Sequence, residues 1–178
     1  RVWGDDSCPY DPTEAEEGLL EQFRSEWSSA APDDDRHLAH LLSGSWSPAS
    51  AGLAWLGVTC TAWGYAYSSA LDGDFDRPPE DHSWNIWDVL VVAHEIGHNI
   101  GADHTHEMSP PIDECGNDEC DDAWGGTIMS YCHLCAPNFM TNIVLDFHAD
   151  VQSDIETHLS GVACNLAAIG GTDVDGDG

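Results

Sequence analysis

The residues that could do chemistry stand together in one segment, HEIGHNIGADH. Residues four apart on a helix share a face, so His94 and His98 can direct two imidazole rings at one point. Gly101 can adopt the left-handed backbone that ends a helix and turns the chain back, which would bring His104 to the same point. Three nitrogen ligands leave the fourth tetrahedral position of a zinc ion open, as a catalytic site requires. Glu95 would then lie close enough to a metal-bound water molecule to act on it.

The extended pattern H-E-x-x-H-x-x-G-x-x-H is far more specific than H-E-x-x-H alone. The chain has 10 histidines and 17 glycines among 178 residues, and at such frequencies the five fixed positions recur about once in a million starting points. A surface helix with scattered histidines is the alternative interpretation. His106 is the rival third ligand, but its spacing lacks the register that Gly101 sets. The other histidines are expected at packing, cleft-wall or surface positions: His37, His40, His82, His133, His148 and His158.

A second segment, GTIMSY, follows downstream and contains Met129. The long histidine motif followed by a turn with a methionine resembles the metzincin zinc peptidases, in which this Met-turn forms a hydrophobic floor beneath the metal. A lone methionine among apolar residues is more often part of a core, but its position after the motif favours the Met-turn.

The charge of the chain is strongly one-sided, with 4 basic residues against 33 acidic ones and a formal net charge of −29. Nucleic acid and anionic membranes would be repelled, so both are poor partners. A solvated acidic coat, adaptation to high salt and several calcium sites are three interpretations that stay open. Apolar residues make up 42% of the sequence, enough for one domain with its own core, and no run predicts a membrane span.

Seven cysteines are many for a cytosolic protein, so we expect an oxidising compartment and a secreted, extracellular protein. Four of them, Cys115, Cys120, Cys132 and Cys135, surround the methionine turn. A second zinc site is one explanation, but only the last two have ligand spacing, so disulfides are favoured. Because the number of cysteines is odd, one thiol has no partner within the chain, and Cys8 is the candidate for it.

Hydrophobic spacing predicts the main elements. We expect helices over residues 13–29, 36–42 and 146–159, and strands over residues 53–58 and 64–69. The active-site helix is expected to begin near Asn85, with Asp88 as its capping partner. Residues 108–126 are rich in Pro, Gly, Asp and Cys, which indicates an irregular loop pinned by disulfides.

Beyond the metzincin motif, the chain resembles the reprolysin-like branch, which includes ADAM and snake-venom peptidases and, most similar, secreted bacterial enzymes. The resemblance covers most of residues 2–160 through the stretches LLEQF, HLAHLLSG, GLAWLG and residues 94–133. It implies an α/β (α+β) zincin fold, with a twisted mixed sheet, an active-site helix and a smaller C-terminal subdomain, in a catalytic domain over residues 1–168. The antiparallel edge strand, whose backbone would pair with an extended protein substrate, is implied for Leu53, Ala54, Trp55, Leu56 and Gly57.

The sequence departs from the reprolysin pattern in three places. Family domains have further strands before the point where Arg1 stands, so we expect a preceding cleavage or boundary, and a separate N-terminal fragment or propeptide as a partner. Thr105 replaces the common aspartate after the third histidine, as in the pappalysin branch. Tyr131 stands two residues after Met129, where astacins and serralysins keep a tyrosine that can approach the metal.

By resemblance, His94, His98 and His104 bind Zn²⁺ and Glu95 is the general base of peptide hydrolysis. Tyr131 either donates a hydrogen bond to the oxyanion or packs as an aromatic residue of the turn. Ser130 and His133 would line the pocket for the substrate side chain just past the cleaved bond.

Two classes of function remain open. A secreted zinc endopeptidase is favoured, because Glu95 is intact; a non-enzymatic, calcium-dependent extracellular binding protein on the same fold is the alternative. Within the first class, a pappalysin- or astacin-type peptidase is the runner-up to the reprolysin type. Pairing of Cys60 with Cys164, with the four cysteines around the Met-turn pairing among themselves, is expected for that runner-up.

The last residues, 169–178, form an acidic Gly/Asp segment. Asp173, Asp175 and Asp177 match the opening half of a calcium loop that lacks its closing glutamate. The segment is either the start of a calcium-binding repeat or a flexible acidic tail. The substrate and the oligomeric state are not given by the sequence.

Overall fold

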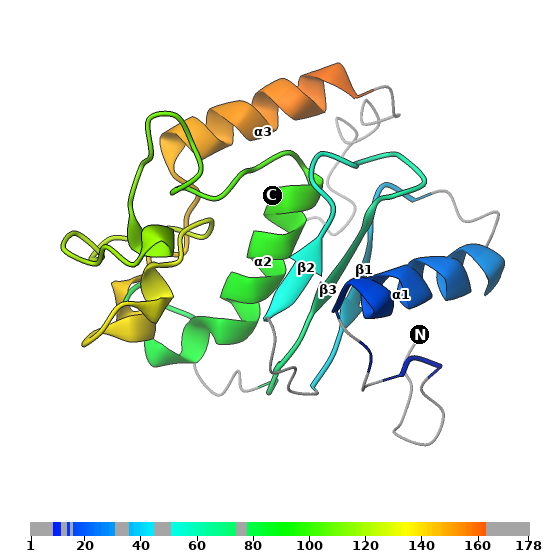
Figure 1. The fold of residues 1–178 in the computed structure, drawn as a ribbon, viewed down its shortest axis with the longest axis horizontal. Coiled ribbons are helices and arrows are strands. Elements are labelled where there is room, and N and C mark those ends of the chain that lie inside the picture. The colour runs from blue at the N-terminus through cyan, green and yellow to red at the C-terminus, as the bar shows by residue number, and fades with distance from the viewer. Residues whose placement is uncertain are drawn as a thin grey trace, which may run out of the picture.

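The computed structural model describes residues 9–11, 14, 16–30, 36–44, 51–73 and 78–162. These described residues form a small sheet and three α-helices (Figure 1). In chain order the elements are α1 (Glu16–Ala30), β1 (Ala39–Leu42), β2 (Gly52–Ala54), β3 (Tyr65–Ser68), α2 (Trp87–Asn99) and α3 (Ala149–Gly161). Four short 3₁₀ turns complete them: Trp84–Ile86, Cys115–Asn117, Cys132–Leu134 and Phe139–Asn142.

The sheet has the strand order β1-β3-β2. β1 runs parallel to β3, with Ala39 opposite Tyr65. β2 runs antiparallel to β3, with Leu53 opposite Tyr67, and lies at an edge of the described sheet. The antiparallel edge strand implied by the resemblance is therefore confirmed, although the strand itself is shorter than expected.

The helix predicted over residues 36–42 is wrong, because residues 39–42 form β1. Ala39 and Leu41 are buried, whereas Leu42 is 59% exposed. This alternation has the period of a strand, and pairing with β3 outweighs the weak local preference of the leucines for a helix.

The two faces of the sheet are covered by different helices (Figure 1). α1 packs on one face, where the ring of Phe23 meets that of Tyr65 edge to face, with centroids 5.3 Å apart. α2 covers the other face, and beyond it a second core joins the helix to the C-terminal part of the chain. α2 is therefore held between the sheet and this second core.

Two disulfides pin the loop of residues 108–126, which is irregular as expected. They join Cys115 to Cys132 and Cys120 to Cys135. The zinc alternative for these four cysteines is thereby wrong, because every sulfur is already bonded to another. Cys60 is also disulfide-bonded, while Cys8, Cys164 and the acidic segment of residues 169–178 lie outside the described residues.

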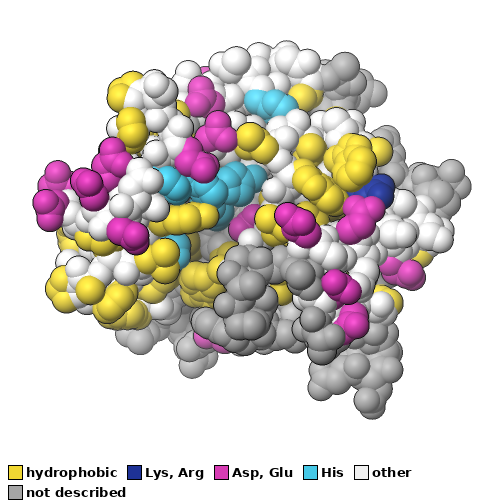
Figure 2. Space-filling model, viewed as in Figure 1, with side chains coloured by type: hydrophobic (Ala, Val, Ile, Leu, Met, Phe, Trp, Pro, Cys, Tyr) yellow, Lys and Arg dark blue, Asp and Glu magenta, His cyan; other side chains and the backbone are white. Residues whose placement is uncertain are grey.

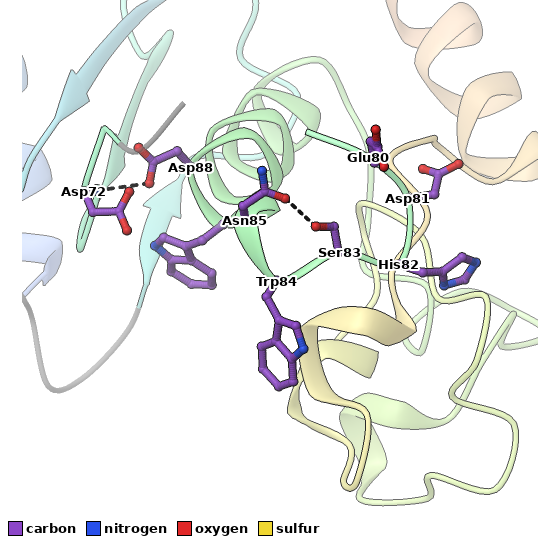
Figure 3. Close-up of a pocket in the computed structure, with 9 residues that line it drawn as sticks. Asp72, Glu80, Asp81, His82, Ser83, Trp84, Asn85 and Asp88 are labelled. Carbon is purple, nitrogen blue, oxygen red and sulfur yellow. Dashed lines mark hydrogen bonds between the residues drawn. The ribbon is translucent and has the colours of Figure 1, made fainter. Parts of the chain in front are cut away.

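The start of α2 differs from the expectation. The helix begins at Trp87 after a 3₁₀ turn, and no side chain caps it. The Asp88 carboxylate instead accepts a hydrogen bond from the backbone N–H of Asp72, at 3.2 Å (Figure 3). It accepts a second one from the backbone N–H of Gly73, at 2.9 Å. Asp88 thus ties the segment after β3 to the helix, a role that depends on tertiary contact. No helix of the described residues is long and apolar enough to cross a membrane.

Candidate metal centre

Three histidines come together at the C-terminal end of α2. His94 and His98 lie one turn apart on the helix, which ends at Asn99. Gly101 has a φ of +98°, and its N–H donates to the carbonyl oxygen of His98 at 3.0 Å. This left-handed residue reverses the chain as its position in the sequence predicted, and His104 returns to face the helix.

The side chains of His94, His98 and His104 each offer a ligand atom, and these atoms lie within 4.8 Å of one another. The Nε2 atoms of His98 and His104 are 3.0 Å apart. The ring centroids of His94 and His98 are 4.8 Å apart, with the rings almost perpendicular. The arrangement matches the convergent nitrogen donors that a small divalent metal ion needs.

The other ring nitrogen of each histidine has an acceptor. Nδ1 of His94 lies 2.7 Å from the carbonyl oxygen of Ile128. Nδ1 of His98 lies 2.8 Å from that of Ala102. Nδ1 of His104 lies 2.8 Å from a carboxylate oxygen of Glu107. These oxygens can only accept, so each Nδ1 carries the hydrogen and each neutral ring keeps a lone pair on Nε2.

The donor set therefore fits a metal ion. The Nε2 atoms of His98 and His104 are 3.0 Å apart, and their lone pairs repel each other unless a cation or a proton lies between them. Burial, together with the smaller effect of neighbouring histidines, lowers the pKa of His94 to about 3 and that of His98 to about 4. Neutral imidazoles near pH 7 are the form that binds a divalent ion.

Glu95 is buried beside this cluster, with 5% of its surface exposed. Its charge is one of the causes, after burial, that raise the pKa of the Tyr131 hydroxyl. Gly52, the first residue of β2, lies against its carboxyl group: a Cβ atom on Gly52 would be 2.5 Å from Glu95 Oε1. The carboxylate thus sits between the helix and the edge strand.

The methionine turn lies against the same helix. Met129 is fully buried, and a Cβ atom on Gly97 would be 2.6 Å from its Sδ atom. Thr105 is also fully buried, and its N–H donates to the carbonyl oxygen of Met129 at 3.1 Å. The threonine that departs from the reprolysin pattern therefore joins the chain after His104 to the turn.

Tyr131 and His106 both lie against His104. The Tyr131 hydroxyl is 3.0 Å from His104 Nε2. The ring of His106 stacks on that of His104, with centroids 5.2 Å apart, and packs closely against Gly116. His106 is not part of the group formed with the two helical histidines; it belongs to a separate group with His104 and Glu107.

The residues named for substrate contact occupy three settings. Leu53 and Ala54 belong to β2, and the residues after them lead into a turn. His133 is half-buried in a 3₁₀ turn near Trp87, with ring centroids 6.1 Å apart. Ser130 is fully buried, and its hydroxyl donates to the carbonyl oxygen of Thr127 at 2.8 Å, which stabilises the methionine turn.

Asn99 and Glu107 are residues of the site that sequence reasoning missed. The Asn99 side-chain amide donates to the carbonyl oxygens of Trp55, at 2.9 Å, and Tyr65, at 3.0 Å. It therefore fixes the end of α2 to the residue that follows the edge strand and to β3. Glu107 could have been found as a carboxylate three residues after His104, whereas nothing local reveals the long-range partners of Asn99.

Histidine side chains reach the surface near the centre of the face in Figure 2, with carboxylates around them and apolar side chains beside them. A hollow of about 500 Å³ near the start of α2 is a separate feature. It is lined by acidic and aromatic side chains and does not include the three histidines (Figure 3).

A mixed sheet covered by a helix that presents two histidines, a glutamate and a following histidine to one region is the architecture of a metallopeptidase. Comparison with protein families supports this class: the Reprolysin_5 model, described as metallo-peptidase family M12, matches residues 3–142. The chain belongs to this family, and the reprolysin-like resemblance is confirmed. No curated protein matches the chain.

The disulfides do not separate the branches as expected. The four cysteines around the methionine turn pair among themselves, the pattern expected of the pappalysin- or astacin-type runner-up, yet the reprolysin model matches. That part of the connectivity is thus compatible with a reprolysin-like chain.

Proposed function

We propose that the protein is a secreted zinc-dependent endopeptidase with the cluster at the end of α2 as its active site. His94, His98 and His104 would hold the ion through Nε2, since each Nδ1 already has an acceptor. When bound, zinc supplies Lewis acidity toward water and toward the carbonyl group of the substrate. This convergence of three Nε2 lone pairs next to a buried glutamate is the observation that carries the proposal.

Glu95 is proposed as the general base. Its carboxylate is buried, and its neighbours on the helix are the two histidines. It would accept a proton from the attacking water and pass that proton to the nitrogen of the leaving amine. The Tyr131 hydroxyl, which stays protonated because burial and the charge of Glu95 raise its pKa, would donate to the developing oxyanion.

The edge strand β2 is the proposed place of substrate binding. Leu53 and Ala54 pair with β3 on one side only within the described sheet. An extended peptide could add to the other side through backbone hydrogen bonds. Trp55, Leu56 and Gly57 would continue this contact toward His98, whose carbonyl oxygen accepts the N–H of Gly57 at 2.8 Å. His133 and the buried Ser130 would shape the adjoining pocket.

Secretion is supported by the disulfide chemistry of the chain. All five cysteines among the described residues are disulfide-bonded, and disulfides persist in oxidising compartments outside the cytosol.

Replacing Glu95 by Gln tests the proposal. The isosteric amide keeps the shape of the site but cannot accept the proton, so casein cleavage should fall by about 10²-fold to 10⁴-fold while zinc content stays at that of the wild type. Glu156→Gln, an exposed position on α3, is the matched control and should keep full activity. Undiminished cleavage by the Glu95 variant would refute the general-base role.

A further inference from the structure

The carboxyl group of Glu95 lies against a bare backbone in the edge strand. A Cβ atom built on Gly52 would meet Glu95 Oε1 at 2.5 Å, Cγ at 2.7 Å and Cδ at 2.8 Å. All three nearest atoms of that position belong to this one side chain. Because Gly52 has no side chain, the space beside its backbone is open to the carboxyl group of Glu95.

Glycine is needed at this position for space and not for its backbone conformation. Gly52 is not among the glycines with a positive φ, such as Gly57 at +63° or Gly101 at +98°. It pairs with Ser68 in regular antiparallel register. An alanine could therefore adopt the same backbone, and its methyl group would act mainly on Glu95.

We propose that Gly52 is a positioning residue that sets the location of the Glu95 carboxylate relative to the metal centre. Any larger residue would push the carboxylate away by about half an ångström or more, because non-bonded Cβ contacts below 3.0 Å are essentially never observed. The end of a glutamate side chain is flexible, so most of the displacement falls on the carboxylate that accepts the proton. This inference rests on the proposed function of Glu95.

A substitution at Gly52 should affect proton transfer by Glu95 and not the other functions of the site. Gly52 contacts no histidine among its three nearest atoms, so metal binding should not depend on it. A misplacement of about 1 Å of a reacting group can lower the rate by about 10²-fold. Loss of kcat with unchanged metal content and unchanged KM is the pattern that distinguishes a positioning role from a structural role or from contact with substrate.

The test compares Gly52→Ala with the wild type and with Gly161→Ala. Gly161 ends α3 and has no positive φ, and no described atom beyond its chain neighbours and its own helix backbone lies within 4 Å of its Cβ position, so it is the matched control. We expect Gly52→Ala to bind zinc like the wild type and to lose kcat about 10-fold to 100-fold, with KM nearly unchanged. Its crystal structure should show the Glu95 carboxylate displaced from its position in the wild type. Gly161→Ala should keep the wild-type kcat.

Thermal stability gives a second measurement that needs no activity. Gly52→Ala should lower Tm by a few degrees in the wild type, but by less in a Glu95→Ala background, because alanine lacks all three side-chain atoms that the added methyl group would meet. If Gly52→Ala alone does not fold, folding of the Gly52→Ala/Glu95→Ala double variant supports the contact. Failure of the double variant as well would overturn it.

Three results contradict the inference: an unchanged kcat, a raised KM with unchanged kcat, and an equal loss of Tm in both backgrounds. The second would mean that Gly52 serves substrate binding. If the wild-type protein cleaves no substrate, the proposed function fails, while the position of the carboxylate and the stability comparison still test the contact.

Discussion

Gly97 in α2 and Met129 in the methionine turn are in direct contact, and a Cβ atom on Gly97 would lie 2.6 Å from Met129 Sδ. The same interface holds the hydrogen bond from His94 Nδ1 to the carbonyl oxygen of Ile128, at 2.7 Å. The turn therefore both fills the space beneath the helix and fixes the orientation of one proposed ligand. A change that separates helix and turn should affect stability and metal binding together.

Gly97→Ala is expected to destabilise the protein by about 1–3 kcal/mol, because a methyl group would overpack the contact with the sulfur. Zinc should also bind more weakly, since His94 would lose its alignment with Ile128. Urea denaturation of the zinc-loaded protein and a competition titration with a chelator measure both effects. Gly161→Ala, in open space, is the control; equal stability of the two variants would contradict the account.

His104→Ala should lower zinc affinity by about 100-fold or more, since it removes one of three proposed ligands. His106→Ala should leave zinc content near that of the wild type, because its ring stacks on His104 and packs on Gly116 outside the three-histidine group. Elemental analysis after dialysis against a weak chelator separates them. The opposite order would make His106 the third ligand.

Tyr131→Phe should reduce kcat by about tenfold with little change in KM or zinc content. The hydroxyl lies 3.0 Å from His104 Nε2, close enough to reach a group bound at the same point. Losing one neutral donor to a developing oxyanion typically costs at least this much. Steady-state kinetics on a peptide substrate measure the change, with Tyr10→Phe in the core beside α1 as a control. An unchanged kcat would leave Tyr131 as a packing residue.

His40 should make the fold sensitive to mild acid. Burial lowers its pKa from 6.5 to about 4 in the folded protein, so the unfolded chain binds more protons between these values. Stability therefore rises with pH through this window and falls as pH drops toward 4. At pH 5 the cost is about 2 kcal/mol.

His40→Gln can keep a hydrogen bond to the Ser68 hydroxyl, which lies 2.9 Å from His40 Nε2, and removes the titration. Urea denaturation at pH 7 and pH 5 should then show a smaller loss of stability in the variant than in the wild type. The same loss in both would show that other groups govern the acid sensitivity.

The sequence predicts those parts of the site that depend only on residues close to one another along the chain. The spacing of His94, His98 and Gly101 depends on the helix period and on one left-handed residue, so the sequence alone predicted the convergence. β1 was mistaken for a helix because its leucines fit either period until β3 supplies a partner. The contacts of Asp88 with Gly73, and of Asn99 with Trp55, join segments 15 and 44 residues apart, and no local pattern encodes such partners.

The most direct test of the account is cleavage of casein by the purified protein, with and without a zinc chelator, together with its zinc content. The account predicts about one zinc ion per chain, cleavage that the chelator abolishes, and recovery when zinc is restored. A protein that binds no zinc at the three histidines, or that cleaves casein equally well in the presence of the chelator, would contradict it.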